Sequence, residues 1–214
     1  MHPECLREEE KGLLSKLKDF LLAHQFIMAG GTALALILGH RKSIDLDFFT
    51  NESFTLDFLL REIEGKGIDY EILAAEEEAL IIIINQTKAS FFYDPYPLTS
   101  EISYQDIPLA SIESIAAMKL LAISQRGAKR DFVDLYFILQ KIPFHKVAEA
   151  FIKRYGKKRT NPIYIGKSLV YFFDADSDPD PEYLPGLKIA WEDIKAFFKA
   201  HIRQLVLDLE QAKK

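Results

Sequence analysis

Cysteine is almost absent from the sequence, because Cys5 is the only one among 214 residues. A disulfide within the chain needs two cysteines, and a cysteine-cluster metal site needs more than one, so both are excluded. The histidines do not make up for this lack, since no two of them stand at the i, i+4 spacing of a helical zinc motif. They are His2, His24, His40, His145 and His201. A zinc site and a histidine-based catalytic triad therefore have no support from the sequence.

Long hydrophobic runs are missing as well. Apolar runs such as Ala79 to Ile84 are far shorter than the roughly 20 residues that a helix needs to cross a bilayer. The first residues, MHPECLREEEKG, are acidic and polar, unlike a secretory signal or an Arg-rich transit peptide. We therefore expect a soluble, cytoplasmic protein with no membrane partner.

The net charge of −5 is unevenly distributed along the chain. Residues 1–110 contain 9 Lys and Arg against 19 Asp and Glu, a net of −10, and residues 111–214 contain 18 against 13, a net of +5. From Arg126 to Lys167 there are 11 basic and 3 acidic residues, a net of +8. This split suggests that one region holds cations and another meets polyanions.

The composition is that of a globular protein, with 49% apolar and 28% charged residues. At roughly 100–200 residues per domain, the length suits one large domain or one and a half. Hydrophobic periodicity predicts the elements, and Thr32 is a candidate N-cap of the helix that follows Gly30-Gly31. Other helices are expected near residues 6–24, 55–64, 111–125, 130–140, 145–156, 163–173 and 191–212. Strands are expected at Phe26–Ala29, Asp45–Phe49, Asp69–Leu73, Leu80–Gln86 and Lys88–Tyr93, and a loop at 174–186. The chain is thus predicted to be α+β over residues 1–110 and helical over 111–214.

The sharpest local feature is GGTALALILGHRKSIDLDFF, residues 30–49. Asp45 and Asp47 are two residues apart on an expected strand, so their carboxylates share a face and repel each other unless a cation neutralises them. Mg²⁺ with substrate phosphates uses such a pair of acids, and Gly30-Gly31 would let the backbone approach a phosphate at a helix N-terminus. The alternative is a glycine turn followed by an edge strand with solvated acids.

A lysine interrupts the apolar stripe of the helix expected at 111–125. The stripe is formed by Ile112, Ile115, Ala116, Lys119 and Ile123, which follow i, i+3, i+4 spacing. An inward-facing Lys119 needs an anionic partner or a functional use. The alternative is a lysine that extends from the edge of the stripe to solvent.

Two aspartates share a face of the next expected helix, because Asp131 and Asp134 are three residues apart. Asp131 could instead be a favourable charge in the first turn of that helix. The neighbouring Arg126, Lys129 and Arg130 could bind phosphate, or they could form a solvated basic face.

These segments resemble known proteins. Residues 30–49 resemble motif I of the nucleotidyltransferase superfamily, the polymerase-β-like fold, which has Gly-Gly or Gly-Ser, a helix, and Asp-hydrophobic-Asp. Arg41, Ser43 and the string Asp-Leu-Asp-Phe-Phe look like the AbiEii toxin branch. The resemblance continues over residues 112–139, with a Lys in the first helix and Arg-Asp-x-x-Asp-Leu-Tyr in the second. Together the matched segments span most of residues 27–140.

The resemblance implies a nucleotidyltransferase-type mixed β-sheet flanked by helices, followed by a C-terminal helical bundle that completes the active-site cleft. It implies transfer of a nucleoside monophosphate from an NTP to an acceptor hydroxyl, with Mg²⁺ or Mn²⁺ as cofactor. It further implies a toxin of a type IV toxin–antitoxin or phage-defence system, with a cognate antitoxin and with transfer RNA as one candidate acceptor. The catalytic residues it implies are Asp45, Asp47, Lys119 and Asp131, of which Asp45 and Asp47 hold the metal. The nucleotide-binding residues it implies are Gly30, Gly31, Thr32, Arg41, Ser43, Arg130 and Asp134.

One departure from the superfamily pattern concerns a third carboxylate, which usually lies on a later strand and faces the first two. Ser90 stands at the expected position, and Asp94 lies at the end of that strand. Either Asp131 takes over this role, or the chain is a nucleotide- or RNA-binding module without transfer. A third alternative is an interaction protein that binds a partner through its helical half.

Aromatic residues are concentrated in FFYDPYP, residues 91–97. This cluster could stack on nucleobases. Core packing combined with a rigid turn is the interpretation that we favour.

Overall fold

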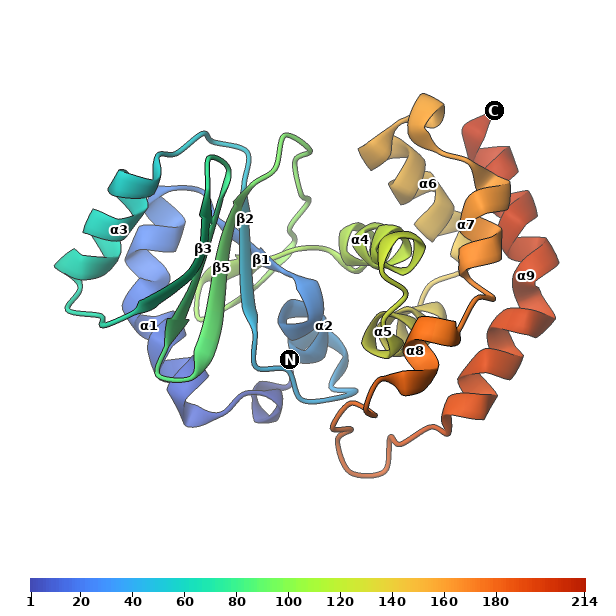
Figure 1. The fold of residues 1–214 in the computed structure, drawn as a ribbon, viewed down its shortest axis with the longest axis horizontal. Helices are drawn as coiled ribbons and strands as arrows, with labels where there is room; N and C mark the ends of the chain where they lie inside the picture. Colours follow the sequence, from blue (N-terminus) through green and yellow to red (C-terminus); the bar gives the residue numbers. More distant parts are fainter. The chain divides into compact units, whose positions relative to one another are not determined.

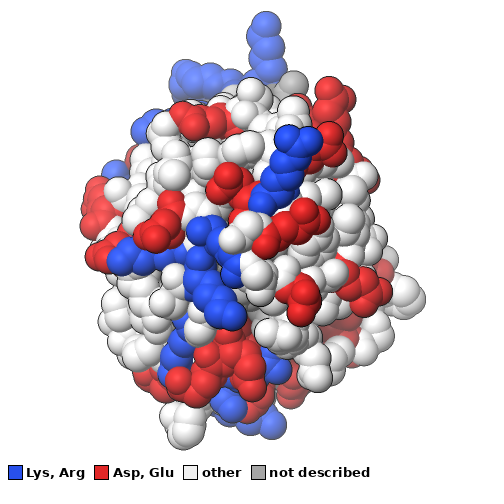
Figure 2. Space-filling view, turned by 90° about the vertical axis from the view of Figure 1, so that its left-hand side faces the viewer, with Lys and Arg blue, Asp and Glu red and all other residues white. Residues whose placement is uncertain are grey.

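In this computed structural model the backbone of residues 1–214 is described, with every side chain except that of Arg159. The chain divides into two compact units, Met1–Ser111 and Ile112–Lys214. Within the part of the chain that the structure describes, no helix is long and apolar enough to cross a membrane. On the face of the molecule drawn in Figure 2, acidic and basic side chains are interspersed rather than gathered into one patch of a single sign.

The first unit is built on a seven-stranded mixed sheet with the strand order β3-β4-β5-β2-β1-β7-β6. Four of these strands, β3, β5, β2 and β1, are labelled in Figure 1. Strand β2 runs parallel to β5 and antiparallel to β1, and β1 runs parallel to β7. The strands are β1 (Ile27–Ala29), β2 (Leu46–Thr50), β3 (Glu71–Glu76), β4 (Ala79–Ile84), β5 (Thr87–Tyr93), β6 (Ile102–Tyr104) and β7 (Ile107–Leu109). The predicted mixed sheet is confirmed.

The helices of this unit are α1 (Glu8–Ala23), α2 (Gly30–Leu38) and α3 (Leu56–Gly65), after a short 3-10 turn, Pro3–Cys5. Helix α1 begins with a capping box in which the Glu10 side chain accepts from the Arg7 backbone N–H. The apolar face of α1 then packs on the sheet, where Phe20 contacts Phe91 of β5 with ring centroids 6.0 Å apart.

Alternation along β2 separates the core face of the sheet from the face that carries the acids. Leu46, Phe48 and Thr50 are buried, whereas Asp47 and Phe49 between them are half-buried. Phe48 stacks on Phe91 at 5.3 Å in the core beneath α1. Because side chains alternate along a strand, Asp47 and Phe49 point to the opposite face of the sheet.

The second unit is helical, as predicted. Its helices are α4 (Ile112–Gln125), α5 (Lys129–Leu139), α6 (Phe144–Tyr155), α7 (Pro162–Ser168), α8 (Phe173–Ser177) and α9 (Trp191–Lys213), with a 3-10 turn at Lys157–Arg159. Its core is centred on Phe132 of α5, which is fully buried and lies 5.2 to 5.8 Å from the rings of Phe172, Trp191 and Phe198.

The structure differs from the sequence predictions at several element boundaries. Thr32 is not the N-cap of α2, because the helix begins at Gly30 with Ala29 as its cap. The strand predicted from Asp45 begins at Leu46 instead, so Asp45 lies just outside it. The helix predicted over residues 163–173 ends at Ser168, and α8 begins at Phe173 and continues into the predicted loop.

The hairpin of β6 and β7 was not predicted. Its strands have three residues each, and they are joined by Gln105 and Asp106, which have φ values of +50° and +66°. Positive φ at both central residues is the geometry of a type I′ hairpin turn, which most often contains Asn or Gly. The two turn residues here are Gln and Asp, which are not a typical type I′ turn sequence, so the hairpin is hard to recognise from the sequence.

Candidate active site

The site in the first unit begins where β1 leads into α2. Gly30 has a φ of +70°, and a Cβ atom built on it would lie 2.6 Å from Oδ2 of Asp47. Ala29, the preceding residue, is the register partner of Asp47 on β2. Only glycine adopts this backbone conformation at low cost and also leaves room for the carboxylate, so the position of Asp47 requires a glycine at residue 30.

The first turn of α2 is tied to the segment that leads into β2. The Thr32 hydroxyl is hydrogen-bonded to the hydroxyl of Ser43 at 2.8 Å and to the carbonyl oxygen of Asp45. A Cβ atom on Gly31 would clash with the guanidinium of Arg41 and lie 3.2 Å from Ser43 Oγ. Arg41 is buried and donates through Nη1 to the Lys42 carbonyl at 2.9 Å.

These contacts bring the predicted residues of the first unit together around one helix N-terminus. The first backbone N–H groups of a helix have no acceptor within the helix, and the helix dipole places partial positive charge there. The first turn of α2 also contains no acidic side chain. This end of α2 is therefore suited to an anion, with the Arg41 guanidinium packed beside it.

The two acids lie next to this helix end. Asp45 and Asp47 are both half-buried, and Leu46 between them is fully buried. Lys88 of β5 forms an ion pair with Asp45, with 3.0 Å between Nζ and Oδ2. Lys88 was not predicted as a site residue. The sequence did contain a hint of this role. Lys88 stands two residues before Ser90, so the two side chains point to the same face of β5.

A hydroxyl stands where the resemblance predicts a third carboxylate. Ser90 of β5 is the register partner of Asp47, and it is buried. Asp94 lies four residues further along, about 13 Å at the usual rise per residue, which is too far to share an ion with Asp47. Ser90 therefore lies opposite Asp47, as predicted.

The donor set fits a divalent ion that arrives with a nucleotide. Among the residues whose side chains are described, no group of three His, Cys, Asp or Glu is placed to hold a metal. Mg²⁺, however, is commonly bound by one or two carboxylates while phosphate oxygens and water complete its coordination. Asp45 and Asp47 meet this requirement, provided that the Lys88 ammonium leaves Asp45.

The second unit holds a buried cluster of charges. Lys119 of α4 forms ion pairs with two residues of α5, Asp131 Oδ1 at 3.0 Å and Asp134 Oδ2 at 2.6 Å. Both aspartates are fully buried, and Lys119 is 6% exposed. The inward-facing lysine predicted from the stripe thus has two anionic partners, one more than its charge requires.

Arg126 supplies the second positive charge of the cluster. Its Nε donates to Asp131 Oδ2 at 2.8 Å and its Nη2 to Asp131 Oδ1 at 3.1 Å. Burial alone would raise the pKa of Asp131, but Lys119 and Arg126 outweigh it and hold the pKa below its usual value. The Arg126 side chain remains 55% exposed, so its outer edge faces solvent.

The other two basic residues of this segment lie apart from the cluster. Arg130 is exposed. Lys129 is buried, and its ammonium donates to the carbonyl of Asp178 and pairs with Asp180 at 3.3 Å. Of these three basic residues, Arg126 is the one that contacts Asp131. The sequence did not distinguish it from the other two, because it lies five residues before Asp131, outside the helix α5 that carries the aspartate.

The chain is similar in sequence to known proteins. The sequence model of the family described as "Nucleotidyl transferase AbiEii toxin, Type IV TA system" matches residues 12–94 and 92–212. An uncharacterized protein of Aquifex aeolicus (strain VF5) is 34% identical over 205 residues, 93% of this chain and 97% of the relative.

Two solved structures are similar in fold. MenT4, a nucleotidyltransferase toxin from Mycobacterium tuberculosis H37Rv, superposes with a TM-score of 0.59 and 19% identity, over 88% of this chain and 78% of that one. The antibiotic-resistance factor ANT(2'')-Ia superposes with a TM-score of 0.50 and 15% identity, over 67% of this chain and 89% of that one. With the family model covering nearly the whole sequence, the chain belongs to the AbiEii nucleotidyl transferase toxin family of type IV toxin–antitoxin systems.

Proposed function

We propose that this protein transfers a nucleoside monophosphate from an NTP to the hydroxyl of an acceptor, with release of pyrophosphate. The observation that carries the proposal is the close approach of Gly30 to Asp47, which places a helix N-terminus beside a pair of carboxylates. An anion-binding helix end next to acids that can hold a cation suits a metal-bound triphosphate better than either ligand alone.

The phosphates would be held by groups that are already ordered. The backbone N–H groups of Gly30 and Gly31 would donate to phosphate oxygens, and Thr32 fixes this turn through its bond to Ser43. Arg41 would offset phosphate charge from beside Gly31. Because these groups are fixed before the substrate arrives, little reorganisation is needed as charge develops on the leaving group.

Asp45 and Asp47 would hold Mg²⁺ or Mn²⁺. When bound, the metal would offset the negative charge of the phosphates in the transition state. The acceptor oxygen forms a bond to the α-phosphorus, the bond from that phosphorus to the bridging oxygen breaks, and pyrophosphate leaves. Lys88 would release Asp45 when the cation binds.

In the second unit we assign phosphate contacts to Lys119 and to the exposed edge of Arg126, with Arg130 nearby in sequence. Asp131 would align the acceptor rather than deprotonate it, because a carboxylate with a lowered pKa is a weak base. The hydroxyl proton then passes to solvent water. Asp134 shares Lys119 with Asp131 and so fixes the position of the ammonium.

The biological setting that we propose follows from the family. The protein would act in the cytoplasm as the toxin of a type IV pair, restrained by a cognate antitoxin, with a role in phage defence. Transfer RNA is the proposed acceptor, and the basic segment from Arg126 to Lys167 is consistent with an RNA partner.

The test is incubation of the purified protein with each α-labelled NTP, total transfer RNA and Mg²⁺. We expect label in the RNA with at least one NTP, and none when Asp47→Ala replaces the wild type or when EDTA is present. Lys16→Gln on the exposed surface of α1 is the matched control and should transfer label normally. No label with any NTP, or equal labelling by Asp47→Ala, would contradict the proposal.

A second candidate function is nucleotide binding without transfer, and the replacement of the third carboxylate by Ser90 favours it. This candidate predicts that calorimetry detects NTP binding in the presence of Mg²⁺ while no acceptor becomes labelled. Because binding to the folded state raises thermal stability, NTP and Mg²⁺ together should also raise the Tm.

A further inference from the structure

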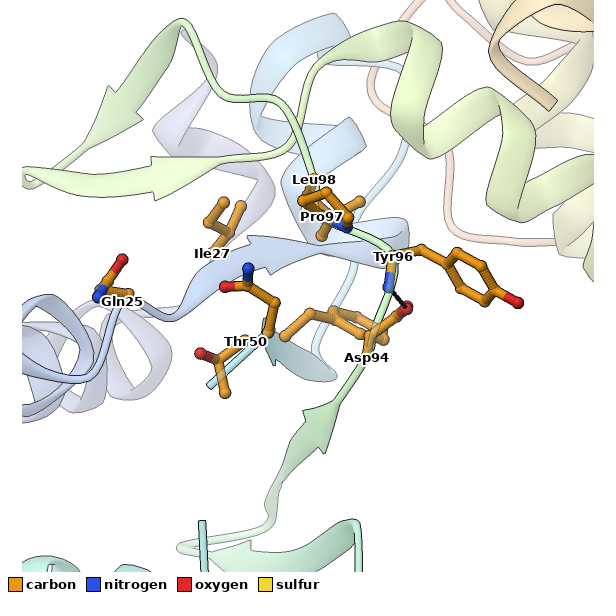
Figure 3. A pocket seen from close by; sticks show the side chains of 9 residues that line it. Gln25, Ile27, Thr50, Asp94, Tyr96, Pro97 and Leu98 are labelled. Carbon is orange, nitrogen blue, oxygen red and sulfur yellow. Dashed lines mark hydrogen bonds between the residues drawn. The ribbon is translucent and has the colours of Figure 1, made fainter. Parts of the chain in front are cut away.

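The aromatic cluster of residues 91–97, which the sequence offered for base stacking, is packed against the rest of the first unit. Phe91 is fully buried in the core, as the favoured interpretation predicted. Phe92 is half-buried and stacks on a phenylalanine ring of β2 at 5.1 Å. Figure 3 shows the turn that follows, where a carboxylate oxygen of Asp94 accepts from the backbone N–H of Tyr96 at 2.9 Å. These contacts give the cluster a structural role in the sheet and its turn.

The exposed aromatic side chains gather instead in one segment of the second unit. The chain contains 16 Phe, 9 Tyr and 1 Trp. Among those whose side chains are described, Tyr164, Tyr171 and Phe173 are exposed, by 57%, 57% and 75%, whereas the others are buried or half-buried. Exposed apolar side chains scattered singly are ordinary, but a cluster of them commonly marks a binding surface. Three exposed rings within residues 164–173 are such a cluster.

The three rings are arranged around the turn between α4 and α5. The Tyr164 hydroxyl donates to the carbonyl oxygen of Ser124 at 3.0 Å, which fixes this ring beside the end of α4. The carboxylate of the residue after Phe173 would lie 3.8 Å from a Cβ atom built on Gly127, so α8 begins beside the same turn. The rings of Tyr171 and Phe173 are 6.3 Å apart, and each limits the motion of the other. Rings held in this way lose little conformational freedom when a ligand stacks on them.

Positive charge lies next to the rings. Lys167 is exposed and stands three residues after Tyr164 on α7, so the two side chains are neighbours on one face of that helix. Arg126, in the turn that the rings surround, is 55% exposed. Asp176 of α8 is hydrogen-bonded to the Lys195 ammonium at 3.0 Å, which offsets its negative charge. The rings are thus accompanied by exposed cations, as a ligand that combines flat rings with negative charge requires.

We propose that an aromatic patch, formed by Tyr164, Tyr171, Phe173 and Lys167, binds a single-stranded stretch of the RNA acceptor; this inference rests on the function proposed above. Unpaired bases stack on aromatic rings whatever their sequence, because every base has a flat face. Lys167 beside the rings neutralises a phosphate that connects two bases. The exposed carboxylate of Asp174 repels phosphate, so the backbone of the strand runs on the Lys167 side of the rings.

A single strand suits the aromatic patch better than a duplex or a protein. In an RNA duplex the faces of the bases are stacked on one another, so protein rings cannot reach them. Protein interfaces use aromatic residues too, but lysine is depleted in them relative to the rest of the surface. Here an exposed lysine lies on the same helix face as one of the rings. The combination of rings with a lysine therefore favours nucleic acid.

The test measures RNA binding without turnover. One probe is a fluorescein-labelled RNA strand of alternating C and A, about 12 nucleotides long, which is within the usual site sizes for single strands. The other is the same strand annealed to its complement. Both are titrated with full-length protein in EDTA and followed by anisotropy. We expect the single strand to bind about fivefold more tightly, although the duplex carries more phosphates. Equal affinities, or tighter binding of the duplex, would overturn the proposal.

Variants of exposed residues locate this preference. Tyr171→Leu combined with Phe173→Leu keeps an apolar surface but removes two rings. It should weaken binding of the single strand about tenfold and that of the duplex by less than about twofold. Tyr171→Phe keeps the ring and should bind like the wild type. Leu207→Ala removes an exposed apolar side chain of α9, and this matched control should also bind like the wild type.

Lys167→Gln tests the phosphate contact. For a single strand, each neutralised phosphate contributes about 0.7 to the slope of log affinity against log salt concentration. The slope for the single strand should therefore be about 0.7 shallower in this variant than in the wild type. Lys16→Gln makes the same change of charge on the exposed surface of α1 and should keep the slope of the wild type. An unchanged slope for Lys167→Gln would overturn the placement of the backbone beside Lys167.

The remaining outcomes are also decisive. If the double leucine variant binds the single strand like the wild type, the proposal is wrong and a protein partner becomes the better occupant of the aromatic patch. If that variant weakens the single strand and the duplex equally, the rings do not bind bases, and the proposal is again wrong. Failure of the proposed transferase function is seen separately, as absence of labelled product while the wild type still prefers the single strand.

Discussion

Gly30 and Asp47 are in such close contact that a single methyl group on Gly30 would lie 2.6 Å from the carboxylate. The two residues belong to adjacent antiparallel strands and their extensions, since Ala29 pairs with Asp47 in register. In the proposed site, the backbone at Gly30 binds phosphate and Asp47 holds the metal, so this contact links the two functions. A change at Gly30 is therefore expected to disturb both.

Gly30→Ala should abolish NMP transfer and lower stability. The left-handed backbone at φ +70° costs alanine roughly 1–2 kcal/mol, and the new methyl displaces Asp47 in addition. Thermal unfolding and label transfer measure the two effects. Gly12→Ala is the control, because Gly12 lies inside α1 with nothing within 4 Å of its Cβ position, so this variant should gain about 0.5–1 kcal/mol. Normal transfer by Gly30→Ala would contradict the prediction.

Lys88→Gln should strengthen metal binding in the absence of nucleotide. The Lys88 ammonium competes with a divalent cation for Asp45, and a partly exposed ion pair contributes about 0–1 kcal/mol. Removing it should therefore tighten Mn²⁺ binding by up to about fivefold. Titration of Mn²⁺ followed by electron paramagnetic resonance measures this change. Lys16→Gln makes the same change in charge elsewhere and should have the affinity of the wild type; a weaker affinity of Lys88→Gln would show that Lys88 does not compete.

Asp131→Asn should destabilise the fold at neutral pH and much less in acid. Asp131 is hydrogen-bonded to two charged donors, Lys119 and Arg126, and such bonds are worth about 1.5–3 kcal/mol. Because the folded-state pKa of Asp131 is lowered, its contribution is fully present above the unfolded pKa of about 4 and is lost as the pH falls through the folded pKa. Urea unfolding of both proteins at pH 7, 5, 4 and 3 tests this.

The difference in unfolding free energy between wild type and Asp131→Asn should be constant from pH 7 to 5 and should shrink below pH 4. Asp193→Asn, at the start of α9, is the control, because its carboxylate is exposed and lies outside the cluster. A difference that is the same at pH 3 as at pH 7 would mean that the charge of Asp131 is not what stabilises the cluster.

Much of the fold could be predicted because its signals are local. Helix α1, strand β2 and strand β4 each bury one face. The apolar residues of that face recur at helical or alternating spacing, so each element can be recognised from its own segment of the sequence. The closeness of Gly30 and Asp47, two residues of the proposed site, also had a local signal, because the glycine pair and the paired acids lie within twenty residues of each other.

The rest depends on contacts between distant segments. The pairing of Lys88 with Asp45 follows from the parallel register of β5 and β2, which no spacing in the sequence encodes. The choice of Arg126 over Arg130 as the partner of Asp131 depends on the geometry of the turn between α4 and α5. Thr32 was predicted to be an N-cap because of its residue type. Its hydroxyl is instead hydrogen-bonded to the Ser43 hydroxyl and to the Asp45 carbonyl oxygen, in the segment that leads into β2.

Ser90→Asp should restore the third carboxylate and change how the protein depends on metal. The new side chain lies directly opposite Asp47, on strands spaced about 4.8 Å apart. In EDTA, the added negative charge should repel Asp47 and lower the Tm, while Mn²⁺ should bind at least tenfold more tightly than to the wild type and recover the loss. Ser90→Asn has nearly the same volume without the charge, so it should show the steric cost but no gain in Mn²⁺ affinity. Equal Mn²⁺ affinities for the two variants would place the metal away from Asp47, because a carboxylate added next to a bound cation must strengthen its binding.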